Sequence, residues 1–166
     1  AIEDGFNPKK LEKLEPDLVV VGNVISRGNP EIEWLLETKR FKFTSLPALL
    51  QDFILSDRYN IVISGTHGKT TTTSIISSIL FHAGFDPTVI NGGIINTWNS
   101  NARLGSGDWM VVEADESDGS FSKFSPTVAI VTKIDREHLD FHGTFKNLEK
   151  SFQNFVSSIP FYGFKV

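Results

Sequence analysis

A short glycine-rich stretch has the residue types needed to bind phosphate. Gly65–Thr70 reads Gly-Thr-His-Gly-Lys-Thr and follows a predicted strand, Asn60–Ser64, while a helix is predicted from Lys69 to about His82. Backbone N–H groups at the start of a helix attract anions, because the helix dipole is positive there. Lys69 adds a cation for phosphate groups, and Thr70 adds a hydroxyl for Mg²⁺. We therefore predict a phosphate site at this loop.

This stretch departs from the common phosphate-loop pattern. G-x-x-x-x-G-K-[ST] needs a glycine where this chain has Ile63, and the nearest glycine is Gly65. The alternative is a glycine turn that binds nothing. Four consecutive threonines, Thr70–Thr73, would then be an odd choice for a purely structural helix start, since threonine is a poor helix former. We favour a phosphate loop of shorter form.

A group of carboxylates follows a second predicted strand, Trp109–Glu113. Four of them fall within six residues: Glu113, Asp115, Glu116 and Asp118. Their mutual repulsion is costly unless a cation offsets it. Mg²⁺ prefers oxygen ligands and often accompanies phosphate, so the cluster predicts a magnesium site. The alternative is a solvated acidic turn.

Two histidines follow a third predicted strand, Val128–Thr132. His138 and His142 are four residues apart and could share a helix face, which raises the possibility of zinc. Zinc needs further ligands, however, and the chain contains no H-E-x-x-H pattern. We favour His138 facing Mg²⁺ or phosphate, with His142 either structural or solvent-facing.

Strands and helices alternate along the chain, which predicts an α/β fold with a mostly parallel sheet and flanking helices. Besides the strands above, we predict strands at Leu18–Val21, Phe41–Thr44 and Pro87–Ile90, helices at Pro8–Leu14, Pro30–Thr38, 47 to about 56 and Phe145–Val156, and a loop at Asn91–Gly93. Ligands of such sheets bind at the carboxyl ends of the strands, where the three chemistry-bearing segments lie.

Composition limits the possible partners and location. The 166 residues carry 16 basic and 20 acidic side chains, a net charge of −4, and contain no run of five or six like charges. Electrostatics therefore gives no reason to expect nucleic acid or a membrane surface as a partner. The chain contains no cysteine and no apolar stretch near the roughly 20 residues of a spanning helix, so we expect a cytoplasmic protein without disulfides. It begins at Ala1, not Met, which suggests a piece of a longer protein.

Several motifs, taken in order, resemble the Mur ligases of peptidoglycan synthesis. They read "DLVVVGNVISRGNPEI", "GTHGKTTTT", "INGGI", "NARLG", "EADESDGSF", "AIVTKIDREHLD" and "PFYG", and together they span nearly the whole chain. The combination is much more specific than any one motif. The short G-T-x-G-K-T loop is the form found in this family, which accounts for the missing glycine.

The resemblance implies a P-loop-type ATPase core preceded by the end of a Rossmann-like substrate domain. Residues 1–56 would be the C-terminal part of the N-terminal UDP-substrate domain plus a linker helix, and residues 57–166 the first part of the central ATP-binding domain. The family's first strand and its C-terminal domain would lie outside these residues. We therefore expect an internal fragment that does not complete catalysis alone.

The implied activity is an ATP-dependent amide ligase, and the nearest branch of the family joins L-alanine to UDP-N-acetylmuramate. ATP and Mg²⁺ are the implied cofactors, and the γ-phosphoryl group passes to the substrate carboxylate to form an acyl phosphate. Alternatives are the recycling ligase that attaches a tripeptide to the same UDP-sugar, folylpolyglutamate synthase, whose other motifs fit less well, and a non-catalytic nucleotide-binding module.

The resemblance also implies roles for individual residues. Lys69, Glu113 and His138 would be catalytic; Gly65, Thr66, His67, Gly68, Lys69, Thr70 and Thr71 would bind ATP; Thr70, Glu113 and His138, with Glu116 as a further carboxylate, would bind Mg²⁺; and Asn91, Gly92, Gly93 and Arg103 would face the UDP-sugar. One position departs from the family, because Lys133 stands where Asn is usual. Its charge would either weaken metal binding or point elsewhere.

Overall fold

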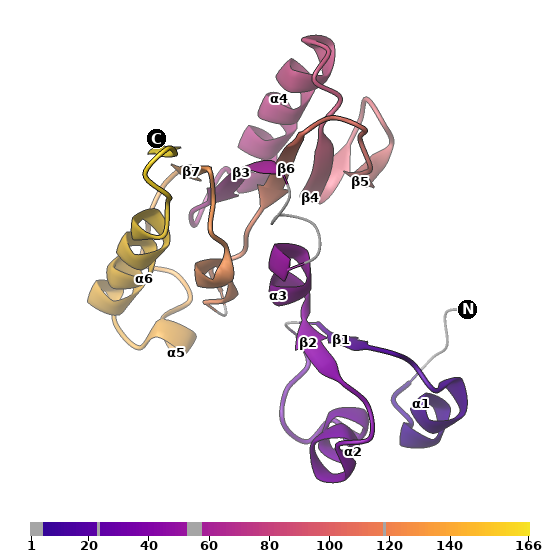
Figure 1. Ribbon diagram of the computed structural model, residues 1–166. Coiled ribbons are helices and arrows are strands. Elements are labelled where there is room, and N and C mark those ends of the chain that lie inside the picture. Colours follow the sequence, from indigo (N-terminus) through magenta and orange to yellow (C-terminus); the bar gives the residue numbers. More distant parts are fainter. Residues whose placement is uncertain (1–4, 23, 53–57, 118) are drawn as a thin grey trace. The chain divides into compact units, whose positions relative to one another are not determined.

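The computed structural model describes residues 5–22, 24–52, 58–117 and 119–166. The chain divides into two compact units, Ala1–Leu50 and Gln51–Val166. Figure 1 labels α1–α6 and β1–β7. Each unit is an α/β structure with its own sheet.

The first unit contains a two-stranded parallel sheet, in which Val19 pairs with Phe43. Its elements are α1 (Pro8–Leu14), β1 (Val19–Val21), α2 (Pro30–Thr38), β2 (Phe43–Ser45) and α3 (Leu46–Leu50). The asparagine caps Asn7 and Asn29 start α1 and α2, each accepting backbone N–H bonds and each followed by proline at the first helical position. Leu35 of α2 is almost fully buried, so the apolar face of that helix supplies part of the core.

The second unit is built on a six-stranded sheet in the order β5-β4-β6-β3-β7-β8 (Figure 1). These strands are β3 (Tyr59–Ser64), β4 (Thr88–Ile95), β5 (Ser100–Arg103), β6 (Trp109–Glu113), β7 (Val128–Val131) and β8 (Phe164–Lys165). β5 runs antiparallel to β4, and the other neighbouring pairs are parallel. The central strands β3 and β6 are almost wholly buried, as continuous apolar runs in a parallel sheet should be.

Helices pack on this sheet and fix the strand ends. Helix α4 (Lys69–His82) contacts β3, β4 and β6, while α6 (Phe145–Ser157) contacts β7 and η2 (Ser120–Lys123). A short helix, α5 (Leu139–His142), precedes α6. Ile76 and Leu80 of α4 pack on the buried strand residues Ile61, Ile63 and Val111. Because α4 is clamped to three strands, its first turn is held at their carboxyl ends.

The predicted fold class, a mostly parallel sheet with flanking helices, is confirmed. Helices α1, α2 and α4 begin and end where predicted. The predicted strands are present, and apart from the end of β4 their ends agree with the prediction to within two residues. The loop predicted at Asn91–Gly93 is wrong: these residues continue β4, which runs to Ile95 because β5 pairs with it. The helix predicted at 47 to about 56 begins at Leu46, and its predicted end lies outside the described residues.

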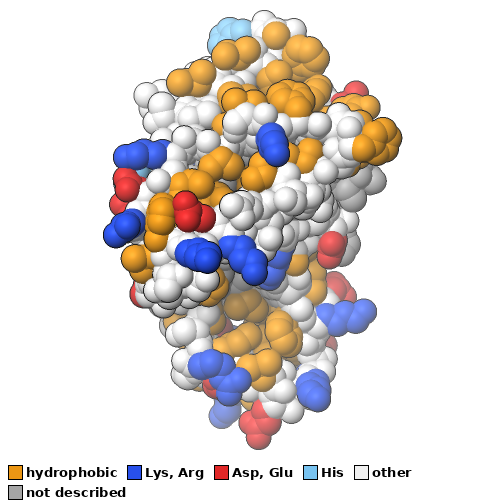
Figure 2. All heavy atoms as spheres, turned by 90° about the vertical axis from the view of Figure 1, so that its left-hand side faces the viewer, with side chains coloured by type: hydrophobic (Ala, Val, Ile, Leu, Met, Phe, Trp, Pro, Cys, Tyr) orange, Lys and Arg blue, Asp and Glu red, His pale blue; other side chains and the backbone are white. Residues whose placement is uncertain are grey.

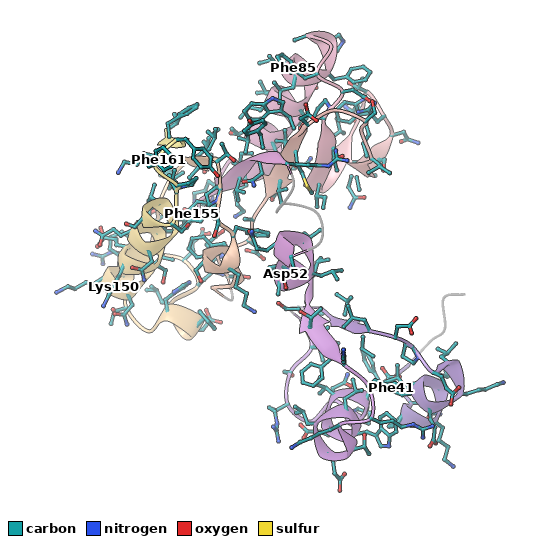
Figure 3. All side chains as sticks on the ribbon, viewed as in Figure 1. Phe41, Asp52, Phe85, Lys150, Phe155 and Phe161 are labelled. Carbon is teal, nitrogen blue, oxygen red and sulfur yellow. The ribbon has the colours of Figure 1, made fainter. Side chains whose placement is uncertain are left out.

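Hydrophobic side chains also reach the surface of the second unit. Figure 2 shows them gathered on the upper part of the face that it displays. Ile75, Ile79 and Phe85 are among the exposed ones. In Figure 3, Phe155 marks the buried side of α6, and Phe161, which is 99% exposed, lies beyond the end of that helix. In the described ranges, no helix is both long enough and apolar enough to cross a membrane.

Candidate functional site

The glycine loop after β3 is held in place by the backbone that follows β7. Thr66 donates its N–H to the carbonyl of Lys133 at 2.7 Å, and its hydroxyl contacts the same oxygen at 3.0 Å. Gly65 has φ +134°, and a Cβ there would lie 2.2 Å from Oγ1 of Thr132. Only glycine therefore fits at this position, and the loop conformation depends on contact between two neighbouring strand ends.

Lys69 is the first residue of α4, and its ammonium group lies over the loop. Nζ donates to the carbonyl oxygen of Gly65 at 2.7 Å and to Oε2 of Glu116 at 2.8 Å. The Lys69 side chain is 15% exposed, and the Glu116 side chain is fully buried. Gly68, the N-cap of α4, has φ +79°, and no described side chain caps the helix start. The N–H groups of the first turn of α4 can therefore bind an anion.

Thr70 and Glu113 meet beside this helix start. The Thr70 hydroxyl donates to Oε1 of Glu113 at 3.0 Å, and the N–H of Gly92 donates to Oε2 at 2.7 Å. Two neighbouring ligands of an octahedral Mg²⁺, each about 2.1 Å from the ion, lie about 3.0 Å apart. The two side-chain oxygens therefore fit a shared magnesium ion.

The close approach of Gly92 to Glu113 is a feature that sequence reasoning missed. A Cβ at Gly92 would lie 2.7 Å from Oε1 of Glu113. Because glycine has no Cβ, the carboxylate can pack directly against the backbone of β4. Gly93 comes equally near the helix start, since a Cβ there would lie 3.0 Å from Cγ2 of Thr70. The glycine pair in the sequence was a signal for close approach, but it was interpreted as a loop.

A second missed residue is Thr132, which directly follows β7. Its hydroxyl contacts the carbonyl of Ser64 at 3.2 Å and donates to the carbonyl of His67. It therefore fixes the loop from the neighbouring strand. The available signal was a hydroxyl side chain at the end of an apolar strand predicted to lie beside the loop.

The two histidines after β7 both lie next to Glu116. Nε2 of His138 is 3.4 Å from Oε1 of Glu116, and Nε2 of His142 is 2.9 Å from its carbonyl oxygen. His142 is 7% exposed, so of its two predicted placements the structural one holds and the solvent-facing one is wrong. No three His, Cys, Asp or Glu residues gather closely enough to hold a metal ion in the described part of the chain, which gives zinc no support.

The rest of the acidic segment takes no part in these contacts. Asp115 is exposed, and its carboxylate accepts from the backbone N–H and the hydroxyl of Ser117 at 3.1 and 2.8 Å. This contact is that of a local turn. Asp118 lies outside the described residues.

The residues predicted to face a UDP-sugar fall in two places. Asn91 is 3% exposed, and its amide donates to Ser74 at 3.1 Å and to the carbonyl of Gly93 at 2.9 Å. Asn91, Gly92 and Gly93 therefore border Thr70 and Glu113. Arg103 does not.

Arg103 pairs across the sheet with Val89, near the amino end of β4. Its guanidinium bonds the carboxylate of Asp86 and the carbonyl of Pro87, both of which precede the strand. It also lies over the ring of Phe81, near the last turn of α4, 4.7 Å from the ring centroid. The structure thus directs Arg103 away from the helix start where the loop lies.

The Lys133 side chain is exposed and pairs with Asp135, and it contacts neither Thr70 nor Glu113 among the described contacts, which favours the second of the two expectations for its charge. Its ammonium is 2.8 Å from Oδ2 of Asp135, and the side chain is 64% exposed. The hydrogen bond from Lys133 lowers the pKa of Asp135, and the same contact raises the pKa of Lys133. His67 faces this segment too, with Nε2 3.4 Å from Glu137 and 3.6 Å from Asp135.

A mostly parallel sheet with a glycine loop at one strand end, and with a lysine and two carboxylates around it, is the arrangement typical of nucleotide-binding α/β proteins. Residues 63–166, more than half of the chain, match the Mur ligase middle domain. The chain belongs to the Mur ligase family.

Similar proteins carry related names. A UDP-N-acetylmuramate–L-alanine ligase of Methylocella silvestris is 52% identical over 156 residues, which are 92% of this chain and 32% of the relative. A ligase of the same name from Cereibacter sphaeroides is 52% identical over 97% of this chain and 34% of its own length. This chain thus spans about a third of the length of the curated relatives it matches.

Solved structures agree with the fold. The UDP-N-acetylmuramate:L-alanyl-γ-D-glutamyl-meso-diaminopimelate ligase of Neisseria meningitides superposes with a TM-score of 0.90, at 27% identity, over 98% of this chain and 55% of that one. The UDP-N-acetylmuramate-alanine ligase of Thermotoga maritima gives a TM-score of 0.77, at 30% identity, over 87% of this chain and 34% of that one. Of these two enzymes, one is named for a peptide substrate and the other for an amino acid, so the fold by itself does not distinguish the two substrates.

Proposed function

We propose that this protein works as an ATP-dependent amide ligase that joins L-alanine to UDP-N-acetylmuramate. The observation that carries the proposal is the contact of Thr70 with Glu113 beside an uncapped helix start that also bears Lys69. Triphosphate and Mg²⁺ together need this set of groups: open N–H donors, a cation and paired oxygen ligands. The names of the curated relatives support the two substrates.

The main task of such a site is to bring two anions together. In the proposed reaction the substrate carboxylate attacks the γ-phosphorus, the bond to the β-phosphate oxygen breaks, and an acyl phosphate and ADP result. The amine of L-alanine then attacks the acyl carbon, phosphate leaves, and the amine loses a proton. Repulsion between carboxylate and triphosphate opposes the first step, so positive charge fixed at the loop lowers its barrier.

We assign the chain's residues to this step as follows. The loop N–H groups from Gly65 to Thr71 bind the phosphates, except that of Thr66, which donates to the carbonyl of Lys133. The ammonium of Lys69 attracts the charge that develops on the phosphates. Thr70 and Glu113 hold Mg²⁺, which neutralises phosphate oxygens when bound. We also keep His138 near the metal as a proposal. Its contact with Glu116, which bonds Lys69, supports this proposal, but no described contact joins His138 to Glu113.

The UDP-sugar would bind along β4. Asn91, Gly92 and Gly93 support this because they border Thr70 and Glu113. Arg103 has a weaker case, since its guanidinium already bonds Asp86 and Pro87. We further propose that residues 1–56 end a UDP-substrate domain and that 57–166 begin the ATP-binding domain of a cytoplasmic enzyme. The break between compact units after Leu50 and the family match from residue 63 support this division.

The test is phosphate release by the full-length protein with ATP, Mg²⁺, UDP-N-acetylmuramate and L-alanine, beside a Lys69→Ala control. We expect the control to lose at least about a hundredfold in kcat, because an interaction with developing charge is removed. Turnover of the unaltered protein no faster than that of the control would reject the ligase assignment. Binding of ATP without turnover would instead favour a non-catalytic nucleotide-binding module.

A second candidate is the peptide-adding ligase of the same family. The structure of the Neisseria enzyme favours it, since the two chains agree over 98% of this chain with a TM-score of 0.90. The same assay with L-alanyl-γ-D-glutamyl-meso-diaminopimelate in place of L-alanine separates the two. A larger kcat/KM for the peptide would assign the protein to that branch.

A further inference from the structure

Glu116 contacts two of the candidate catalytic side chains, Lys69 and His138, which come from two other segments of the chain. Its Oε2 accepts from Lys69 at 2.8 Å, and its Oε1 lies 3.4 Å from Nε2 of His138. We propose that Glu116 is the positioning residue of Lys69: it holds the ammonium over the phosphate loop and acts on phosphoryl transfer through that lysine, not as a magnesium ligand. This inference rests on the proposed ligase function.

The carboxylate of Glu116 is well suited to fix the position of the Lys69 ammonium. Its side chain is fully buried, and its backbone carbonyl accepts a hydrogen bond from His142, which is itself 7% exposed in α5. A lysine side chain has four rotatable bonds and loses much entropy when fixed, so it stays in one position only if its partners are rigid. Glu116 and the loop carbonyl of Gly65 are such partners.

The geometry leaves Lys69 able to act. An ammonium group has three N–H donors, and two of them are used by Gly65 and Glu116. The third is available to a phosphate oxygen. Lys69 can thus remain bound to Glu116 while it contacts the nucleotide, which is what a pre-positioned cation requires.

The two carboxylates of the segment after β6 have different partners. Glu113 contacts Thr70 through one oxygen and the N–H of Gly92 through the other. Glu116 gives one oxygen to Lys69, and its other oxygen, Oε1, has no hydrogen-bond partner among the described residues. This division favours Glu113 as the magnesium ligand and Glu116 as the partner of the lysine.

Loss of the Glu116 charge should separate binding from catalysis. A buried negative charge next to Lys69 repels the triphosphate, so Glu116→Gln should leave KM for ATP unchanged or lower it by up to about tenfold. The amide holds the ammonium less firmly than a carboxylate does, because a charge-assisted hydrogen bond is lost. We therefore expect kcat to fall by roughly 10-fold to 100-fold.

The experiment compares Glu116→Gln with two variants of the same segment in the full-length protein, measuring kcat, KM for ATP and the Mg²⁺ concentration for half-maximal rate. Glu113→Gln should raise the Mg²⁺ requirement, which Glu116→Gln should leave unchanged. Asp115→Asn is the matched control, since Asp115 is exposed and bonds only Ser117 among the described residues. It should behave like the unaltered protein.

Two results would overturn the inference. A raised Mg²⁺ requirement in Glu116→Gln would make Glu116 a metal ligand, and an unchanged kcat would remove it from the reaction. If the unaltered protein neither binds MgATP nor turns over, the proposed function itself fails. If the unaltered protein is active and Glu116→Gln has the same kcat, the positioning role is refuted and the proposed ligase function stands.

A double-mutant cycle with Lys69→Met tests the proposal even if Glu116→Gln lowers stability, because it compares the effect of Glu116→Gln on kcat with and without the lysine. If Glu116 acts through Lys69, adding Glu116→Gln to Lys69→Met should produce no further loss of kcat. The cycle also predicts thermal stability: Lys69→Met leaves a buried carboxylate unpaired and should lower Tm, and the double variant should recover part of the loss. Additive losses in kcat, or a further fall in Tm, would contradict the proposal.

Discussion

Two polar clusters lie near opposite ends of α4, and they differ in how completely their groups are paired. The hairpin cluster is Asp86, Arg103 and Ser106. One carboxylate oxygen of Asp86 accepts from the N–H and the hydroxyl of Ser106 at 2.8 and 2.6 Å, and the other pairs with Arg103. The Arg103 guanidinium also bonds the carbonyl of Pro87. The charged groups of this cluster are therefore paired with one another, with Ser106 and with the neighbouring backbone.

The loop cluster is Lys69, Thr70, Glu113 and Glu116. It too contains ion pairs and hydrogen bonds, but within the described ranges its groups are less completely paired. The buried Glu116 Oε1 accepts no hydrogen bond and has only a 3.4 Å contact with Nε2 of His138, and the α4 start has no side-chain cap. Such open groups cost stability unless something outside the cluster pairs with them. The hairpin cluster is therefore best explained by stability, and the loop cluster by binding.

The largest effect should come from Gly65→Ala, which tests whether the loop geometry is needed. A Cβ would meet Thr132 Oγ1 at 2.2 Å at φ +134°, so the loop must leave its conformation. We expect the free energy of unfolding to fall by about 2–4 kcal/mol. We also expect no detectable binding of MgATP at millimolar concentration. Denaturant unfolding and calorimetry measure the two.

Gly68→Ala is the matched control. Gly68 also has positive φ, +79°, but no described heavy atom lies within 4 Å of the position a Cβ would take. It should cost only about 1–2 kcal/mol in stability. Equal losses in the two variants, or MgATP binding by Gly65→Ala at unaltered affinity, would show that contact with Thr132 does not shape the site.

A smaller effect, confined to stability, is expected for Asp86→Asn. Hydrogen bonds from Ser106, followed by the contact with Arg103, hold the pKa of Asp86 well below its usual range. A depressed pKa stabilises the fold above the unfolded value, near 4, and this contribution is lost as the pH falls toward the folded pKa. The unaltered protein should therefore exceed Asp86→Asn in stability at pH 5–7, by a margin that shrinks below about pH 4.

Thermal unfolding of both proteins across pH 3–7 measures this difference, and MgATP affinity at pH 7 provides the contrast with the loop cluster. We expect the affinities to agree within about twofold, because Asp86 contacts none of the loop-cluster residues among the described contacts. A strong loss of affinity would mean that the hairpin cluster serves the site and that the comparison is wrong.

The smallest effect should come from Lys133→Asn, which introduces the residue usual in the family. The Lys133 side chain is 64% exposed and paired with Asp135, and only its backbone carbonyl contacts the loop. Exposed ion pairs contribute little, so the free energy of unfolding should be nearly unchanged. MgATP affinity should change by less than about twofold. A clear rise in affinity, measured by calorimetry, would show that the charge does reach the metal region.

Elements with local signals could be predicted well. Helices α1 and α2 start after an asparagine cap followed by proline, and α4 starts after the glycine loop. These signals lie within a few residues of the feature they define. The edge strand β5 was not predicted, because Ser100–Arg103 is polar and forms a strand only by pairing with β4.

The same distinction holds for the site. The sequence by itself determined that a glycine loop, a lysine and carboxylates follow buried strands, since residue type, spacing and strand ends are local properties. Which carboxylate meets which partner was decided only by the tertiary structure. Lys69 and Glu116 are 47 residues apart, and Thr70 and Glu113 are 43 apart. Those pairings exist because the sheet sets β3 beside β6 in a fixed register, and no local pattern specifies that register.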